Sequence, residues 1–446
     1  MIGSVAAVAV RVDVAVVPGQ KSVEPVPEVG FAARSHLHEY QPGGGVGDRD
    51  VEEPVSLRSN ELADLLSQVD QGTFAAGIYR KVLGLHSRQF KGQARKSCTK
   101  LGLMEYVRLG STGLKVSPLC LGTMMFGEWG NPDHEDSVRV IHAALDAGIN
   151  FWDTANVYSH GEAEEIVGKA LKGHRDEVIL ASKFHHQMGE GPNDRGNSRN
   201  HIFRAVEDSL RRLDTDYIDL YQAHRPDPLT DIAETLGALT DLVRQGKVRY
   251  LGSTTFPAGD IVEAQWAARS NHLERFVCEQ PPYSIMVRDI ERAVLPAAAK
   301  YKMGVIVWSP LAGGWLSGKH RKGVPVPEPH GRAERIPERF DPALPGNQRK
   351  YEVVEQLIPL AGKYGMSIVE MAIAWTLEHP AVTCSIIGPR TLEQLKGQLN
   401  AAEIKLPKKL LDEIDAIVPP GVTLNPADNG YEPVWLQPEY RRRCGP

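Results

Sequence analysis

The sequence contains no uninterrupted apolar run of the roughly 18 to 20 residues that a membrane-spanning helix needs. Its apolar N-terminal stretch, residues 1–18, is interrupted by Arg11 and Asp13 and follows no basic region, so we do not interpret it as a signal peptide. The chain also lacks an excess of basic residues, because its formal net charge is -5. This balance argues against a dedicated nucleic-acid binder. We therefore expect neither a nucleic-acid partner nor a membrane partner.

Cysteines are few and widely spaced. The five cysteines form no Cys-x-x-Cys pair and no Cys/His spacing typical of zinc ligands. The sequence thus predicts neither a disulfide framework nor a metal site, and a reducing, cytoplasmic location fits best. Aromatic residues make up only 7 %, but 42 % hydrophobic and 24 % charged residues are typical of a globular enzyme with a sizeable core.

The character of the sequence changes near residue 104. Residues 1–103 combine an alternating Val/Ala run, a Pro/Glu stretch, the glycine-rich segment 41–47 and a basic segment 80–100, without a sustained hydrophobic period. We predict a disordered extension over residues 1–103 and one domain over residues 104–446, with a C-terminal tail from about residue 419. The extension is either accessory or the result of a start codon assigned too early. The basic segment alone favours a regulatory or targeting arm instead.

After residue 104, short apolar runs alternate with longer amphipathic stretches, which indicates the strand and helix units of a parallel sheet. The predicted strands are residues 119–124, 150–153, 178–183, 217–224, 248–253, 276–280, 304–309 and 383–387. The predicted helices are residues 137–147, 162–171, 202–213, 232–245, 261–268, 290–300, 351–374 and 391–402. Eight such units predict an α/β fold, the TIM (β/α)8 barrel, because an open doubly wound sheet would have about five or six strands. Residues 106–109 and 114–117 flank a Gly-Ser-Thr-Gly turn and predict a β-hairpin that plugs the barrel floor.

Polar residues follow the second, third and fourth predicted strands, at the end where barrels of this type build their active sites. Asp153 and Tyr158 follow the second strand, Lys183 ends the third and His224 ends the fourth. Taken singly, each has an ordinary explanation as a helix cap, a solvated charge or a hydrogen-bonded core residue. Together they make a proton-delivery device, because a cation such as Lys183 stabilises the phenolate of a weakly acidic phenol.

Three segments carry a family resemblance: residues 151–164 (FWDTANVYSHGEAE), residues 179–183 (ILASK) and residues 217–224 (YIDLYQAH). Their order, and the five-residue spacing from Asp153 to Tyr158, resemble the aldo-keto reductase superfamily, in its branch of bacterial aldo/keto reductases and potassium-channel beta subunits. The resemblance covers residues 104 to about 418, and Met104 stands where members usually begin. It implies a TIM barrel that binds NADPH without a Rossmann domain. It also implies a catalytic tetrad of Asp153, Tyr158, Lys183 and His224.

The residues that hold the cofactor are implied in the same way. They are Thr254, Thr255, Gln280, Trp308, Ser309, Leu311, Gly313, Lys319, Gly388, Arg390, Gln394 and Gln398. The last group lies where the eighth strand turns into a helix, whose free N–H groups attract phosphate. Arg390 adds a charged fork suited to a 2′-phosphate, which favours NADPH over NADH. No G-x-G-x-x-G follows a predicted strand, in agreement with the lack of a Rossmann module.

Two places depart from the family pattern. Thr254 and Thr255 stand where many members carry Ser-Asn, so hydroxyl groups replace the usual amide side chain at the expected carboxamide site. Near the adenine end, Gly397 and Gln398 replace an acid-Asn pair that often follows the position of Gln394. Gln398 can still hydrogen-bond an adenine edge, but the acid is missing.

The sequence therefore predicts an NADPH-dependent oxidoreductase that reduces a small-molecule aldehyde or ketone to an alcohol, with Tyr158 as the general acid. One open alternative is a regulatory subunit of the same fold that senses NADPH with little turnover. Another is a metal-dependent hydrolase that uses His185 and His186. It is disfavoured because adjacent histidines point to different sides of a backbone and no His-x-His ends the first strand.

The substrate and the oligomeric state are left open. Specificity is expected from loops 125–136 and 321–348 and from the C-terminal segment 424–443, where Tyr431 and Trp435 would close over the cleft.

Overall fold

The computed structural model describes residues 31–37, 49–55, 104–324, 332–433 and 436, and the chain divides into two units, Met1–Thr99 and Lys100–Pro446. Within the first unit the structure describes two strands, β1 (Phe31–Leu37) and β2 (Arg49–Val55), which pair antiparallel. The sequence analysis predicted no regular element there, because neither segment alternates apolar and polar residues. The basic segment 80–100 lies outside the described residues.

Eight parallel strands of the second unit form a closed barrel, as predicted. The strands are β5 (Leu119–Gly122), β6 (Phe151–Asp153), β7 (Ile179–Phe184), β8 (Ile218–Ala223), β9 (Val248–Thr254), β10 (Phe276–Gln280), β11 (Gly304–Val307) and β12 (Cys384–Ile387). Each pairs with the next along the chain, and β12 pairs with β5 to close the barrel. All eight predicted strands are confirmed, with small differences at their ends.

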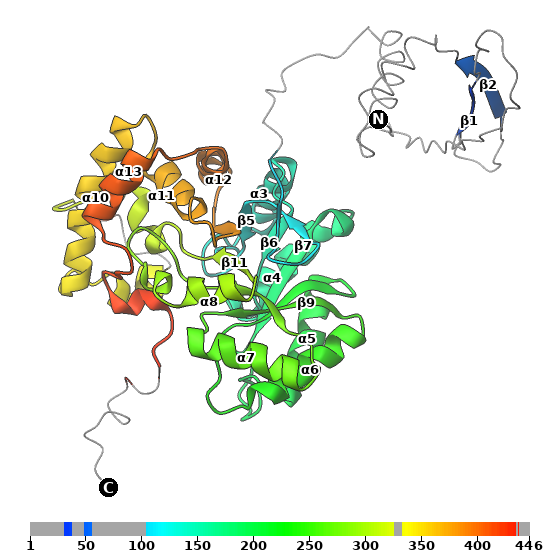
Figure 1. The fold of residues 1–446 in the computed structure, drawn as a ribbon, viewed down its shortest axis with the longest axis horizontal. Helices are drawn as coiled ribbons and strands as arrows, with labels where there is room; N and C mark the ends of the chain where they lie inside the picture. The colour runs from blue at the N-terminus through cyan, green and yellow to red at the C-terminus, as the bar shows by residue number, and fades with distance from the viewer. Residues whose placement is uncertain (1–30, 38–48, 56–103, 325–331, 434–435, 437–446) are drawn as a thin grey trace, which may run out of the picture. The chain divides into compact units, whose positions relative to one another are not determined.

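Helices lie outside the strands, and neighbouring helices such as α5, α6 and α7 pack against one another around the barrel (Figure 1). They are α3 (His134–Asp146), α4 (Glu162–Leu171), α5 (Arg199–Leu213), α6 (Ile232–Arg244), α7 (Ala258–Ser270), α8 (Val294–Lys300), α10 (Pro345–Lys363), α11 (Ile368–Leu377) and α12 (Leu392–Leu399). The sequence analysis missed the four-residue α9 (Arg332–Arg335) and the amphipathic α13 (Lys408–Ile417). Among the described residues no single helix is long and apolar enough to cross a membrane. Taken as a pair, α10 and α11 have the length and composition of a span, but they are bent by 90° at their junction.

One predicted helix is wrong. Residues 351–374 belong to two helices, because the chain turns at Gly365, which has a φ of 74° and ends the first helical run. Ser367 then begins α11 through a capping box, in which the Ser367 side chain and Glu370 each bind the other residue's backbone N–H. The hydrophobic period continues across this break, so periodicity alone could not locate it.

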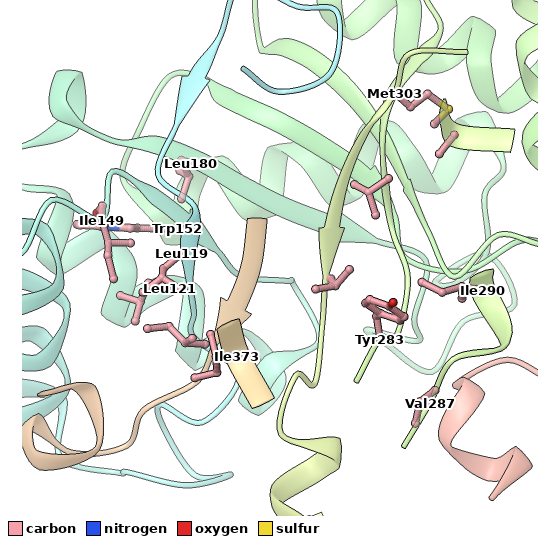
Figure 2. Packing of buried hydrophobic residues seen from close by; sticks show 14 of the residues in the cluster. Leu119, Leu121, Ile149, Trp152, Leu180, Tyr283, Val287, Ile290, Met303 and Ile373 are labelled. Atoms are coloured by element: carbon pink, nitrogen blue, oxygen red, sulfur yellow. The ribbon is translucent and has the colours of Figure 1, made fainter. Parts of the chain in front are cut away.

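Successive side chains along each strand point alternately out of and into the barrel, which produces two separate hydrophobic cores. Leu119, Leu121 and Trp152 point outward and pack against helices, together with Ile373 of α11 (Figure 2). The residues between them point inward and fill the barrel with mostly small or slender side chains: Cys120, Phe151, Ala181, Leu220, Cys278, Ile306 and Cys384. The three cysteines of this inner set are buried free thiols.

The predicted hairpin plugs the barrel. Strands β3 (Val107–Arg108) and β4 (Lys115–Val116) pair antiparallel, and Leu109 and Val116 join the inner core. At the turn, Gly110 has a φ of 56°, and a Cβ there would lie 2.4 Å from the backbone nitrogen of Gly304. The hairpin thus closes the end of the barrel where the strands begin and leaves the other end for a site.

Candidate functional site

The four residues predicted as a tetrad meet at the carboxyl ends of three adjacent strands. Asp153 ends β6, Lys183 lies near the end of β7, and His224 directly follows β8. Tyr158 opens the short helix η1 (Tyr158–Gly161), which connects β6 to α4. Because parallel neighbours end at the same edge, the barrel brings these side chains together from distant positions in the sequence.

Lys183 is the centre of this group. Its ammonium is fully buried and donates to Asp153 Oδ2 at 2.5 Å and to the Thr154 carbonyl at 2.8 Å. It also donates to the Tyr158 hydroxyl oxygen at 3.1 Å. Burial opposes the charge on Lys183, but the nearby Asp153 and Tyr158 outweigh it and raise the pKa of the ammonium. The raised pKa favours the charged ammonium, so a cation faces the hydroxyl oxygen of Tyr158.

Two glutamines hold the other oxygen of the Asp153 carboxylate. Gln280 Nε2 donates to Asp153 Oδ1 at 2.8 Å, and Gln222 Nε2 donates to the same atom at 3.2 Å. Gln280 was predicted as a cofactor ligand, whereas Gln222 was given no role. The sequence could have indicated a role for Gln222, because it lies two residues before His224 and therefore on the same face of β8.

The surroundings of His224 favour the neutral imidazole. Burial is the main cause that lowers its pKa well below the usual value, and the neighbouring Arg225 charge lowers it further. Its Nδ1 is buried and makes no hydrogen bond to a described residue. The ring stands edge-on to Tyr158, with 5.8 Å between ring centroids. A neutral imidazole beside a phenol can donate one hydrogen bond to a ligand oxygen without adding charge.

Two aromatic residues flank the phenol and the imidazole: Trp129, from the loop expected to set specificity, and His186, which the sequence suggested only for the alternative metal site. The Trp129 ring lies 6.2 Å from the ring of Tyr158, and His186 packs edge-on against His224 with centroids 4.6 Å apart. His185 turns away and bonds Asn197 Oδ1 at 2.9 Å, as expected for adjacent histidines. The part of the chain that the structure describes holds no group of three or more His, Cys, Asp or Glu arranged as metal ligands.

The predicted nicotinamide ligands surround the ends of β9, β10 and β11. Thr254 Oγ1 donates to the His224 carbonyl at 3.1 Å, and the Thr255 backbone N–H donates to the Gln280 carbonyl at 3.1 Å. Trp308 directly follows β11. Beyond it, Ser309, Ala312, Gly313 and Gly314 all have positive φ, so the chain there adopts the repeated left-handed turns typical of anion-binding loops. Leu311 lies within this loop, and Lys319 is an exposed cation just beyond it.

The predicted phosphate end lies at the start of α12. Thr391 caps the helix by accepting from the Gln394 backbone N–H, and Gln394 Oε1 accepts from the Arg390 backbone N–H at 2.8 Å. Gly388, which precedes them, is exposed. The Arg390 guanidinium forms no ion pair or hydrogen bond within the described ranges, and the buried Gln398 Oε1 has no partner there either. A free guanidinium and an unpartnered buried amide oxygen fit a phosphorylated dinucleotide.

Glu279 is a buried acid that the sequence analysis missed. Its carboxylate accepts from the Ser253 hydroxyl and from the Phe256 backbone N–H. Burial raises its pKa to about 7, although these hydrogen bonds oppose the shift. Glu279 thus ties the ends of β9 and β10 together directly beside Gln280.

The segment after α13 forms one wall of the site. Asp428 lies in η7 (Pro426–Asn429) and pairs with the fully buried ammonium of Lys350 at 2.5 Å. Gly430 then packs so closely on Trp308 that a Cβ would lie 2.7 Å from Trp308 Cζ2. Tyr431 is partly buried, whereas Trp435 lies outside the described residues, so the predicted closure by this pair stays a prediction.

Comparison with known proteins identifies the family. The chain matches the aldo/keto reductase family over residues 118–419, and it belongs to that family. It is 42 % identical over 327 residues to the uncharacterized oxidoreductase YrpG of Bacillus subtilis, covering 71 % of this chain and 96 % of that protein. It is 35 % identical over 322 residues to a rice protein named "Probable voltage-gated potassium channel subunit beta", covering 71 % of this chain and 97 % of the relative. The family and the first relative support an oxidoreductase.

Proposed function

We propose that the protein reduces aldehydes or ketones to alcohols with NADPH, and that Tyr158 is the general acid. The observation that carries this proposal is the buried Lys183 ammonium, which lies 2.5 Å from Asp153 and 3.1 Å from the Tyr158 hydroxyl. An ordinary structural ion pair does not require a phenol at its open side. A phenol that donates a proton does require a neighbouring cation, because the cation stabilises the phenolate that forms when the proton leaves.

Each tetrad residue has one task in this mechanism. Tyr158 gives its proton to the oxygen of the substrate carbonyl, and Lys183 stabilises the phenolate left behind. Asp153 holds the Lys183 ammonium in place. His224, as a neutral imidazole, donates a hydrogen bond that orients the carbonyl oxygen toward Tyr158. Asp153, Lys183 and His224 are buried, whereas Tyr158 is only partly buried, so the phenol can reach a substrate from the open side of the group.

The cofactor ligands are proposed from the loops described above. Trp308 would stack on the nicotinamide, and Gln280 with Thr254 and Thr255 would hold its carboxamide. The loop that contains Ser309, Leu311 and Gly313, with Lys319, would face the pyrophosphate. Gly388, Arg390, Gln394 and Gln398 would hold the adenosine and its 2′-phosphate. Bound in this way, NADPH would supply the hydride for the reduction.

A panel of aldehydes and ketones tests the proposal directly. Purified protein with NADPH and each carbonyl compound should show loss of nicotinamide absorbance in step with formation of the alcohol. Complete lack of turnover across the panel would contradict the proposed reaction.

A second candidate function is a regulatory subunit that binds NADPH with little turnover. It is favoured by the 35 % identity to a relative named as a potassium channel subunit beta. The same panel distinguishes the two, since a sensor would bind NADPH tightly yet reduce no compound at an appreciable rate.

Replacing Arg390 should weaken the binding of NADPH but not that of NADH. Because the Arg390 guanidinium would contact only the extra phosphate, Arg390→Ala should weaken NADPH binding by about 1.5 to 3 kcal/mol, the scale of a hydrogen bond to a charged group. NADH binding serves as the internal control and should stay nearly unchanged. Isothermal titration with both cofactors measures the difference, and equal losses for the two would refute the assignment of Arg390.

The segment before Met104 should be dispensable. Every barrel strand, every proposed tetrad residue and every proposed cofactor ligand lies after Met104. A chain that begins at Met104 should therefore show the same melting temperature and the same turnover as the full chain. Insoluble protein or lost activity would show that the barrel depends on residues 1–103.

A further inference from the structure

Arg225 is a charged residue at the site that the proposed mechanism does not use. It follows His224 directly, and its Nη1 donates to the His224 carbonyl at 2.6 Å. The same Nη1 lies 3.4 Å from Thr254 Oγ1 and 3.3 Å from Thr255 Oγ1. The guanidinium thus lies over the end of β9, among the tetrad and the proposed carboxamide ligands.

The positive charge of Arg225 is not neutralised by the protein. Within the described ranges the Arg225 guanidinium forms no ion pair with a carboxylate, and its side-chain hydrogen bonds all come from Nη1, so Nε and Nη2 donate to no described residue. Burial lowers its pKa to about 10, and Arg339 opposes the charge as well, whereas Tyr158 and Glu279 favour it. Enclosing a guanidinium without a counter-ion is costly, so the position is stabilised when an anion binds there.

Arg339 is a second cation that adds to the positive charge near Arg225. The Arg339 guanidinium lies 5.8 Å from the ring of Trp308, and its Nε is 4.0 Å from Asp428. Asp428, however, already pairs with Lys350 at 2.5 Å, so two cations share one carboxylate. Gly430 lies between Trp308 and Arg225, because it packs on the edge of Trp308 and a Cβ there would lie 3.8 Å from Arg225 Nη2. Positive charge therefore borders Trp308 on two sides.

Near the tetrad, Glu279 favours the Arg225 charge, but its carboxyl group already accepts from Ser253 and Phe256 and forms no ion pair with the guanidinium. His224 and His186 are neutral at physiological pH, because burial is the main cause that lowers the pKa of both, that of His186 to about 3. Trp129 is an aromatic wall beside Tyr158. The Asp153 carboxylate is already taken up by Lys183.

We propose that the preferred substrates are carbonyl compounds that carry a carboxylate, and that Arg225 binds this carboxylate while Tyr158 and His224 engage the carbonyl. This inference rests on the proposed function. Nε and Nη2 of one guanidinium match the two oxygens of a carboxylate, which gives orientation as well as attraction. The phosphates of the cofactor are a less fitting occupant, because their proposed ligands follow β11 and β12, whereas Arg225 follows β8 next to the proton donor.

Matched acids and methyl esters test the inference. The acids 4-carboxybenzaldehyde and succinic semialdehyde are compared with methyl 4-formylbenzoate and methyl 4-oxobutanoate, which keep the aldehyde and the carbon skeleton but lose the charge. We expect kcat/KM to be at least tenfold higher for each acid than for its ester. Esters that are reduced as well as the acids would overturn the inference and leave the proposed function intact, whereas no turnover of any aldehyde would overturn the proposed function.

Variants of Arg225 assign the preference to a residue. Arg225→Gln should lower the acid-to-ester ratio of kcat/KM by about 10- to 100-fold, the effect of losing a charge-assisted hydrogen bond, and Arg225→Lys should keep part of the ratio. Arg269→Gln is the matched control, because it removes one exposed charge near the end of α7 and should leave the ratio unchanged. Equal losses for acid and ester in Arg225→Gln would show a positioning role only and overturn the assignment.

A binding measurement gives an answer that does not depend on turnover. Terephthalate should raise the melting temperature of the wild type more than that of Arg225→Gln, with dimethyl terephthalate as the uncharged control. An identical shift in both proteins, or a loss of NADPH affinity in Arg225→Gln larger than the loss of terephthalate binding, would overturn the inference.

Discussion

Replacing Tyr158 by Phe is expected to lower turnover by about 10²- to 10⁴-fold, the range that a positioned general acid supplies. The variant keeps the ring that packs near Trp129 and under the Lys183 ammonium, 4.8 Å from the ring centroid. It removes only the hydroxyl that faces Lys183. Steady-state kinetics with the best aldehyde of the panel, together with titration of NADPH, measures the effect, and the affinity for NADPH should change little.

Tyr106→Phe is the matched control for this variant. Tyr106 lies just before the floor hairpin, with 45 % of its surface exposed, and should lose no activity when its hydroxyl is removed. Undiminished turnover in Tyr158→Phe would remove Tyr158 from the mechanism.

Replacing Lys183 by Met should cost both stability and activity. The substitution leaves the buried Asp153 carboxylate without its cation, and removal of one partner of a buried ion pair typically costs about 3 to 5 kcal/mol. Turnover should fall by at least about 10²-fold, because the phenolate of Tyr158 would form without a neighbouring positive charge. Urea unfolding and steady-state kinetics measure the two effects.

A second buried pair separates these effects. Lys350, like Lys183, has a fully buried side chain and lies 2.5 Å from an aspartate, Asp428. Lys350→Met should therefore lower the free energy of unfolding by a similar amount but reduce turnover far less, since Lys350 contacts no tetrad residue. If both variants lost activity to the same extent, the loss in Lys183→Met would reflect damaged folding, and the catalytic task of Lys183 would be refuted.

The barrel could be predicted because its strands carry a strong local signal. Most of the eight are short, largely apolar runs, and burial on both faces makes such runs stand out. The break between α10 and α11 could not be found by the same means, because it depends on the left-handed turn at Gly365 and the cap at Ser367. The pairing of β1 with β2 also gives no local signal, since it depends on contacts between segments that do not alternate.

The tetrad could be collected from strand ends and from family resemblance, but its surroundings could not. Arg225 and His186 each follow a predicted site residue in the sequence, yet their directions depend on the loops after β8 and β7. Glu279 gave no signal, because its raised pKa results from complete burial at the ends of two paired strands, and the sequence alone does not show that burial. Charge and solvation at a site follow from tertiary packing, which no spacing rule contains.

The wall formed by Asp428 and Gly430 is among the last parts of this chain to be synthesised. The proposed tetrad leaves the ribosome early, with β6, β7 and β8, while the residues that cover Trp308 are synthesised after the last barrel strand and α13. A premature stop codon after Val418 would therefore spare all eight strands and the whole tetrad. In the shortened protein, Trp308 would lose the backbone that packs on its edge and Lys350 would lose its carboxylate.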